Sequence, residues 1–198
     1  LCGGPAGMVH TAIQAAKNGA TVVQLRAPNW KKRQWLATAF ALKAALAPYG
    51  VPLIINDHID VALAVDAEGV HVGQGDLPAL ETRRLIGPDR ILGLSVGSAE
   101  EMATVPAAGV DYLGIGPVYP TGTKADAGEA IGVALFAELV VATALPVVAI
   151  GGIHRDNCTP LFEAGTDGVA VVSAICGRDD PARATATLNE TIQLALKR

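Results

Sequence analysis

The chain has 198 residues, of which 51% are hydrophobic and 17% charged, and its formal net charge is −4. This composition can bury one substantial core, so we expect a single domain over residues 1–198. Dispersed Lys and Arg argue against a nucleic-acid surface that depends on phosphate neutralisation. No apolar run approaches the roughly 20 residues of a membrane span, so we expect a cytoplasmic protein.

Short runs rich in Val, Ile and Leu alternate with stretches of helical periodicity along the chain. The pattern predicts strands at residues 21–26, 52–56, 69–73, 91–96, 112–118, 146–152 and 168–175. It predicts helices at residues 8–18, 32–47, 59–65, 80–86, 133–143, 159–164 and 182–196. One more helix is expected after Ser98, which forms a capping-box pattern with Glu101. Such alternation is typical of a parallel sheet that is buried on both faces.

An open doubly wound sheet and a closed (β/α)₈ TIM barrel both satisfy this pattern. Polar residues follow nearly every predicted strand, whereas an open sheet gathers its ligand groups at one switch point, so the distribution favours the barrel. A barrel needs eight strands, but seven runs are visible and the chain opens at Leu1-Cys2 directly before a helix. We therefore expect that the first strand is missing from the N-terminus, and that the chain is a fragment or one segment of a longer polypeptide.

Two carboxylates, Asp57 and Asp76, follow consecutive predicted strands. Adjacent ends of parallel strands would bring the two side chains together, and their hard oxygens are the ligands that Mg²⁺ takes while it keeps several waters. The alternative is that each aspartate caps the helix after it. His71 lies inside an alternating strand and is expected to be a packed residue, and His58 is expected to be a solvated residue at a helix start.

Two phosphate-binding loops are predicted at the same end of the strands. Thr121, Thr123 and Lys124 combine hydroxyls with a cation, which suits a phosphate or diphosphate, although an exposed surface turn would have the same composition. Gly152 and Ser173 follow the last two strands, where backbone N–H groups bind a phosphomonoester in barrels, although glycines also serve tight turns alone.

Other candidates lie on the strands themselves. Gln24 and Arg26 alternate on one strand and are expected to face the barrel interior, where the arginine needs an anionic partner. Ser95 ends a strand and could donate to a reacting group or only form a turn. The sequence shows no nucleophile with an adjacent base. Two anion sites without a nucleophile suit the joining of two phosphorylated small molecules with loss of diphosphate.

Several motifs together resemble the thiamine-phosphate synthase family, in order from about Gln24 to Ile175. They are Gln24-Leu25-Arg26, Ile55-Asn56-Asp57-His58-Ile59-Asp60-Val61-Ala62, Gly69-Val70-His71-Val72-Gly73-Gln74-Gly75-Asp76-Leu77, Gly93-Leu94-Ser95, Pro120-Thr121-Gly122-Thr123-Lys124 and Ala149-Ile150-Gly151-Gly152-Ile153. The resemblance implies a (β/α)₈ barrel that couples 4-amino-2-methyl-5-hydroxymethylpyrimidine diphosphate to 4-methyl-5-(2-hydroxyethyl)thiazole phosphate, giving thiamine phosphate and diphosphate. It also implies a dissociative reaction through a pyrimidine carbocation.

The resemblance further implies a role for each candidate residue. Asp57 and Asp76 would hold Mg²⁺, and Ser95 and Lys124 would serve catalysis. The pyrimidine diphosphate would be bound by Gln24, Arg26, Asn56, Ser95 and Lys124. The thiazole phosphate would be bound by Thr121, Thr123, Gly152, Val172 and Ser173.

Three positions depart from the family pattern. Pro28 stands where the family normally has a lysine, and Lys31 or Lys32 is the expected substitute for its charge. Ser95-Val96-Gly97-Ser98 replaces the usual Ser-x-His-Thr, and His154 replaces a threonine or asparagine. Each change is expected to weaken or retune binding.

Two rival functions remain open on the sequence. A thiazole tautomerase of the same superfamily usually lacks the second aspartate and the Thr-x-Thr-Lys loop, both of which are present here. A non-catalytic phosphate-binding relative would keep the same motifs, so only an assay separates it. Barrel helices have apolar inner faces in monomers and oligomers alike, so the pattern favours no oligomeric state.

Overall fold

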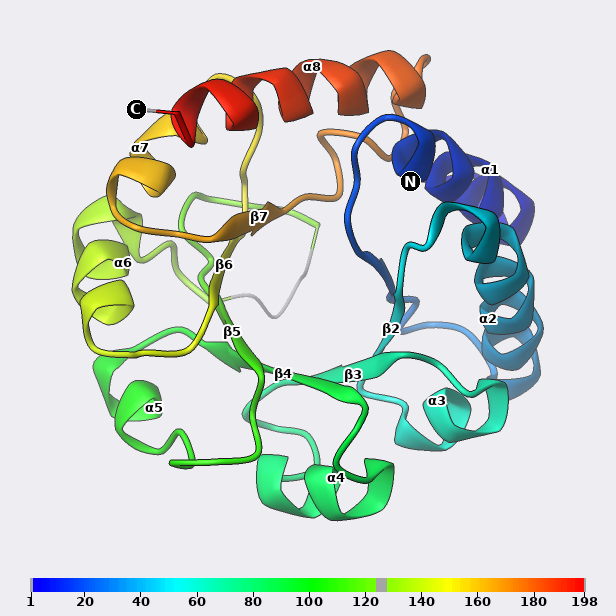
Figure 1. Ribbon diagram of the computed structural model, residues 1–198, viewed down its shortest axis with the longest axis horizontal. Coiled ribbons are helices and arrows are strands. Elements are labelled where there is room, and N and C mark those ends of the chain that lie inside the picture. The colour runs from blue at the N-terminus through cyan, green and yellow to red at the C-terminus, as the bar shows by residue number, and fades with distance from the viewer. Residues whose placement is uncertain (1, 124–127, 198) are drawn as a thin grey trace.

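The computed structural model describes residues 2–123 and 128–197, and its parallel sheet curls into a barrel-like ring with helices outside it (Figure 1). Within these residues the strands are β1 (Val23–Leu25), β2 (Leu53–Asn56), β3 (Gly69–Val72), β4 (Ile91–Val96), β5 (Tyr112–Ile115), β6 (Val147–Ile150) and β7 (Gly168–Ala170). The helices are α1 (Gly4–Lys17), α2 (Lys32–Leu46), α3 (Ile59–Val65), α4 (Ala79–Ile86), α5 (Ala99–Ala103), α6 (Gly132–Val141), α7 (Thr159–Glu163) and α8 (Pro181–Ala195), with a 3₁₀ turn, η1 (Ala47–Tyr49), after α2.

The seven strands are parallel and follow one another in chain order across the sheet. This order confirms the predicted barrel-type alternation and excludes the open doubly wound alternative, whose strand order reverses at a switch point. Because all strands run the same way, every loop that follows a strand lies at one end of the barrel. The chain segments that carry the candidate residues are therefore gathered on a single face.

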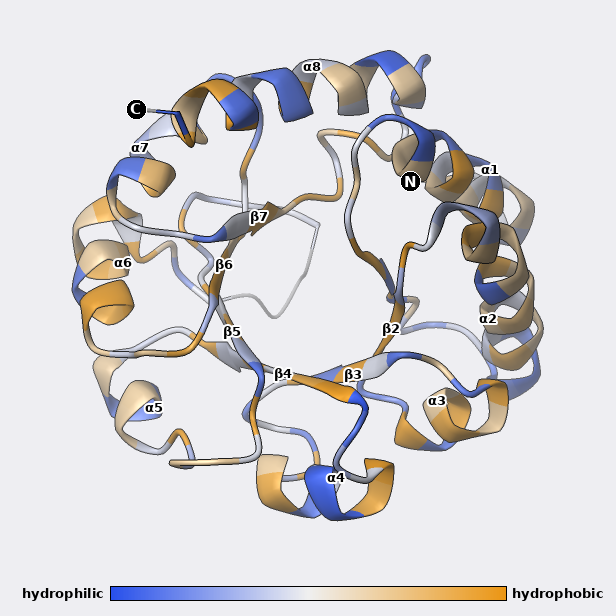
Figure 2. Cartoon of the chain, in the orientation of Figure 1, coloured by the Kyte–Doolittle hydropathy of each residue, from blue (hydrophilic) through white to orange (hydrophobic). Residues whose placement is uncertain are grey.

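Alternation along the strands separates the core from the barrel interior. Val70, Val72 and Leu92 belong to the apolar core between sheet and helices, which also contains Trp35 and Leu42 of α2. The intervening strand residues face the inside of the ring. On the helices, buried residues such as Trp35 of α2 and Phe136 of α6 alternate with exposed ones, and Figure 2 shows apolar and polar stretches side by side along them. The buried core holds the strands in register, and the interior is left for polar groups.

Most predicted elements are confirmed, with small shifts that have local causes. Ser98 caps α5, since its hydroxyl accepts the Glu101 N–H at 3.2 Å and the Glu101 carboxylate accepts the Gly97 N–H at 2.6 Å. Helix α1 begins at Gly4, four residues earlier than predicted, because Pro5 suits the first turn of a helix. The last strand ends at Ala170, five residues earlier than predicted.

The N-terminal segment lies against the loop that follows β7. The Cys2 thiol is hydrogen-bonded to the Cys176 thiol, and α1 runs beside α8 on the outside of the ring (Figure 1). These contacts join the N-terminal segment to the C-terminal part of the chain. Among the described helices, none is both long and apolar enough to cross a bilayer.

Candidate active site

The two aspartates predicted as metal ligands lie in contact. Asp57 follows β2, Asp76 lies in the loop after β3, and their side chains are hydrogen-bonded to each other. Burial, the shared hydrogen bond and the negative charge of Asp76 raise the pKa of Asp57 to about 6. A carboxyl pair in this arrangement binds its proton more tightly than an isolated aspartate does when no cation is near. The expected convergence of the two strand ends is therefore confirmed.

The capping alternative for these aspartates is wrong for the described structure. The residues at the N-cap positions of α3 and α4 are His58 and Pro78, and neither helix has a side-chain cap. Asp76 instead accepts the Gly73 N–H at 2.8 Å, which orients its carboxylate within the β3 loop. Asp57 has a backbone φ of 59°, a left-handed conformation that is uncommon outside glycine. Such local strain is concentrated at functional sites.

Positive charge and a neutral amide surround the aspartate pair. The Asn56 side chain bonds Asp57 and the Arg26 charge acts on it, and both lower the pKa of its carboxyl against the effect of burial. Among the described residues there is no group of three or more His, Cys, Asp and Glu side chains that could hold a metal. Two carboxylates fit a Mg²⁺ ion that takes its other ligands from water and substrate phosphate. The donor set thus fits the metal predicted from the sequence.

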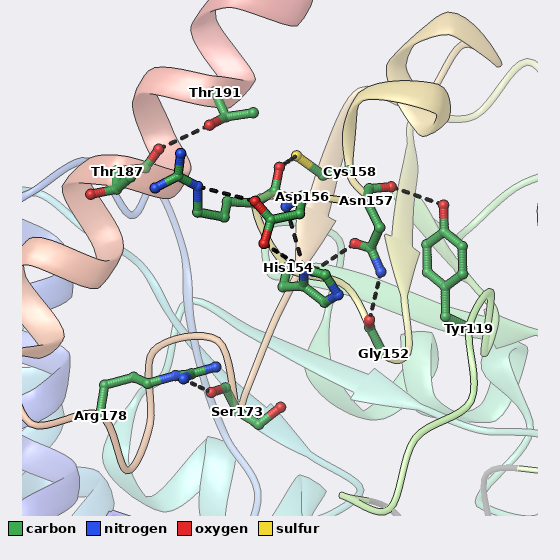
Figure 3. A network of polar contacts seen from close by, with 11 residues as sticks. Tyr119, Gly152, His154, Asp156, Asn157, Cys158, Ser173, Arg178, Thr187 and Thr191 are labelled. Carbon is green, nitrogen blue, oxygen red and sulfur yellow. Dashed lines mark hydrogen bonds and ion pairs between the residues drawn. The ribbon is translucent and has the colours of Figure 1, made fainter.

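A second group of candidates meets around Gly152, after β6 (Figure 3). The Asn157 side chain donates to the Gly152 carbonyl at 3.0 Å and accepts the His154 N–H at 2.8 Å. The Tyr119 hydroxyl donates to the Asn157 carbonyl at 2.8 Å. Asn157, which the sequence reading missed, therefore braces the glycine loop.

The remaining predicted phosphate residues border this loop. The Thr121 hydroxyl accepts the Thr123 N–H at 3.2 Å, and the preceding Pro120 packs directly against Gly152. Val172 is 42% exposed, and the Ser173 carbonyl accepts the Nε–H of Arg178 at 2.9 Å (Figure 3). Lys124 lies outside the described residues.

The His154 side chain, at one of the three departures from the family pattern, contacts residues of its own loop. Its side chain is 49% exposed, and its Nδ1 lies 3.6 Å from the Asp156 carboxylate and accepts the Asp156 N–H at 3.3 Å. These contacts hold the ring along its own loop. The backbone N–H of His154, bonded to Asn157, is the part that shapes the glycine loop.

Ser95 and His71 are in direct contact, which corrects the sequence-based view that no nucleophile has a base beside it. The distance from His71 Nε2 to the Ser95 hydroxyl oxygen is 2.9 Å, and His71 Nδ1 lies 2.8 Å from the Tyr112 hydroxyl. The packed position expected for His71 is confirmed, because only 7% of the residue is exposed. Tyr112 and its link to His71 were missed, because the two residues are far apart in the chain.

Known proteins are similar to this chain over most of its length. A family model described as thiamine monophosphate synthase matches residues 4–175. A thiamine-phosphate synthase from Laribacter hongkongensis is 54% identical over 188 residues, which cover 95% of this chain and 89% of that protein. The chain belongs to the thiamine-phosphate synthase family.

Further relatives of the thiamine-phosphate synthase family agree. A thiamine-phosphate synthase from Xanthobacter autotrophicus is 51% identical over 189 residues, which cover 96% of this chain and 90% of that protein. A solved thiamine phosphate pyrophosphorylase from Pyrococcus furiosus is 38% identical, with a TM-score of 0.87, and covers 95% of this chain and 90% of that chain. A 3-hexulose-6-phosphate synthase structure, at 18% identity and a TM-score of 0.70, shares the fold alone.

The departure from the family pattern at Pro28 is accompanied by a lysine near the aspartates. Lys32, at the start of α2, donates to His58 Nδ1 at 2.9 Å and to the Asp60 carboxylate at 2.6 Å. Burial and the Lys32 charge lower the pKa of His58, which favours the neutral ring that can accept this bond. His58 lies at the start of α3, as predicted, but it packs edge-on against Trp35 and is half-buried, so it is less solvated than expected. Lys32 is thus placed next to the residue that follows Asp57.

Proposed function

We propose that this chain joins 4-amino-2-methyl-5-hydroxymethylpyrimidine diphosphate to 4-methyl-5-(2-hydroxyethyl)thiazole phosphate, with release of diphosphate and formation of thiamine phosphate. The observation that carries the proposal is the hydrogen-bonded pair of Asp57 and Asp76 next to Arg26, in a chain of this family. Paired carboxylates beside a guanidinium suit a diphosphate with its divalent cation. The thiazole tautomerase rival would have no use for this pair.

Mg²⁺ would be held by Asp57 and Asp76, where it would neutralise negative charge on the diphosphate. Arg26, Gln24 and Asn56 would bind and orient the pyrimidine diphosphate from the neighbouring strands. On the other side of the barrel, Thr121, Thr123, Gly152, Val172 and Ser173 would bind the thiazole phosphate. Lys124 is proposed as a further diphosphate ligand on the strength of the sequence alone.

Bond cleavage would precede bond formation. The C–O bond to diphosphate breaks with both electrons going to the leaving oxygen, and the pyrimidine ring stabilises the resulting carbocation. The lone pair of the thiazole nitrogen then forms the new C–N bond. Residues of this chain would act by positioning the two substrates and by binding the departing charge. No covalent bond to the protein is required.

Incubation of the purified chain with both substrates and Mg²⁺ tests the proposal directly. We expect thiamine phosphate and diphosphate in equal amounts, measured by chromatography and a coupled phosphate assay. The polypeptide should include residues upstream of Leu1 where these exist. A folded protein that binds both substrates without forming product would instead support the non-catalytic relative.

The effect of Asp57 on stability is expected to depend on pH. The folded protein holds a proton on Asp57 more tightly than the unfolded chain, because the pKa is raised from 3.8 to about 6. Stability associated with this group is therefore present at low pH and lost as the pH rises through about 6. In metal-free buffer, the melting temperature of Asp57→Asn should exceed that of wild type near pH 7.5, and the difference should shrink as the pH falls toward about 4. A melting-temperature difference that does not change with pH would contradict the raised pKa of Asp57.

Lys32 is expected to supply the charge missing at Pro28. Lys32→Ala should raise the KM for the pyrimidine diphosphate about tenfold, because a charge-assisted contact to the diphosphate is lost. Lys31→Ala is the matched control, since Lys31 is an exposed neighbour without a side-chain cap bond to α2. Steady-state kinetics on both variants provide the measurement. Equal KM values for the two variants would remove Lys32 from the diphosphate site.

A further inference from the structure

Three residues at one level of the barrel interior are arranged around a glycine. His71 on β3, Gly93 on β4 and Tyr112 on β5 are register partners on neighbouring strands. A Cβ at Gly93 would lie 2.2 Å from the Tyr112 ring carbon Cζ and 2.4 Å from His71 Nδ1. Gly93 therefore leaves the space in which the two side chains meet across β4. Their rings are 5.4 Å apart between centroids, with the Tyr112 hydroxyl 2.8 Å from Nδ1.

The next level of the interior repeats this arrangement. Ser95 on β4 is in register with Gly114 on β5, and a Cβ at Gly114 would lie 3.0 Å from His71 Cε1. The absence of a side chain there lets the His71 ring reach up to Ser95, 2.9 Å from Nε2. Both ring nitrogens of a buried histidine are thus engaged by hydroxyl groups. The tautomer of His71 decides which hydroxyl donates and which accepts.

The Tyr112 phenol is the hydrogen donor that this arrangement offers to His71, because its oxygen lies 2.8 Å from Nδ1. Gln24 lowers the pKa of this phenol. Burial is the larger effect and raises the pKa of Tyr112 to about 12, so the phenol keeps its hydrogen. That hydrogen is then available to His71 Nδ1. An Nδ1 that accepts leaves the ring hydrogen on Nε2, which donates to Ser95.

We propose that Tyr112 and His71 form a hydrogen-bond relay of fixed direction that positions Ser95 as a donor toward the pyrimidine substrate. In this relay His71 Nε2 already carries a hydrogen, so the ring cannot take the serine proton. Ser95 therefore acts through its own O–H and not as a nucleophile. His71 and Tyr112 are positioning residues, and the identity of the substrate rests on the proposed function above.

The tautomer of His71 can be measured without turnover. The protein contains four histidines, so ¹⁵N-histidine labelling gives a simple two-bond ¹H–¹⁵N spectrum, and the missing signal in His71→Gln assigns His71. We expect the Nε2–H tautomer in wild type near pH 7.5, and a larger Nδ1–H fraction in Tyr112→Phe, which lacks the hydroxyl hydrogen. An Nδ1–H tautomer in wild type would overturn the relay.

Kinetics of two amide variants separate positioning from structural support. The glutamine amide in His71→Gln reaches the place of Nε2 and keeps a donor to Ser95, whereas the asparagine amide in His71→Asn reaches only the place of Nδ1. We expect kcat within about 3-fold of wild type for the first variant and a loss of about 10-fold for the second. In the Ser95→Ala background, His71→Asn should cause little further loss, because its effect passes through the serine.

The outcomes distinguish this proposal from the proposed function. An equal loss from His71→Asn with and without the Ser95 hydroxyl would overturn the positioning role. Tyr112→Phe is the conservative variant if His71 variants are unstable, and it should lower kcat with little change in KM. Tyr49→Phe, at an exposed tyrosine in η1, is its control and should behave as wild type. Absence of wild-type turnover would overturn the proposed function, while the histidine spectrum would still test the relay.

Discussion

Asp57→Asn is expected to lower kcat/KM by at least about 100-fold and to raise the melting temperature of the metal-free protein. Activity falls because the variant removes one of the two carboxylates proposed to hold Mg²⁺. Stability rises because the neutral amide removes a charge whose burial, together with its closeness to Asp76, raises the pKa of Asp57 to about 6. Since the Asp57 side chain is partly exposed, solvent screening reduces the gain to about 1 kcal/mol, or about 2–4 °C for a chain of this size.

Asparagine is the right replacement because of the backbone at this position. The φ of 59° suits Asn, whereas an alanine would add strain of its own and confuse the stability measurement. Turnover with saturating Mg²⁺ and thermal unfolding in a chelating buffer provide the two readouts. Full activity in Asp57→Asn would show that Asp57 is not needed to hold Mg²⁺ and has only a structural role.

Asp66→Asn provides a matched control. Asp66 also has a positive φ, 54°, but it lies at the C-terminal end of α3, away from the strand ends that carry the site. It pairs with Arg90 at 2.7 Å and with Lys43, and Arg90 in particular holds the pKa of its carboxyl below the usual range. We expect unchanged kcat/KM and a slightly lower melting temperature. Opposite stability effects at two aspartates of similar backbone would show that the cause is electrostatic.

Gly152→Ala is expected to impair binding of the thiazole phosphate, and more strongly than Gly50→Ala. At φ 66°, the new Cβ would lie 2.6 Å from the Pro120 carbonyl and 2.8 Å from the Tyr119 Cβ. Relief of this overlap must move the loop that leads to Thr121 or the loop braced by Asn157. We expect a KM for the thiazole phosphate about tenfold higher or more, measured at saturating pyrimidine diphosphate.

Gly50→Ala separates backbone strain from the collision. Gly50 has a similar φ, 64°, but nothing lies within 4 Å of its ideal Cβ. Both variants should lose about 1 kcal/mol of stability from the left-handed backbone alone. Only Gly152→Ala should change the KM for the thiazole phosphate. A similar KM change in Gly50→Ala would mean that the effect is global and that Gly152 has no special place in the site.

Much of the fold could be predicted because it depends on local patterns. The run 91–96 became β4 with the expected ends, and Ser98 and Glu101 formed the expected cap. Hydrophobic periodicity and capping are properties of neighbouring residues, so the chain displays them directly. Ends were less certain where tertiary contacts compete, as in the last strand, which stops at Ala170.

The position of the aspartate pair was predictable for a different reason. Once β2 and β3 are assigned as consecutive parallel strands, their carboxyl ends must be neighbours, so Asp57 and Asp76 must approach. Whether they cap helices or face each other was left open by the sequence. The structure decided this, because it starts α3 and α4 without either side chain.

The order of strands and helices, the family, and the end of the barrel at which the polar residues gather can all be predicted from the amino-acid pattern. Which of those residues touch depends on the three-dimensional packing. His71 meets Ser95 and Tyr112 across 24 and 41 residues of chain because strand register places two glycines, Gly93 and Gly114, beside its ring. Periodicity places a side chain on one face of a strand, whereas its partner depends on the register between strands and the space left by their neighbours.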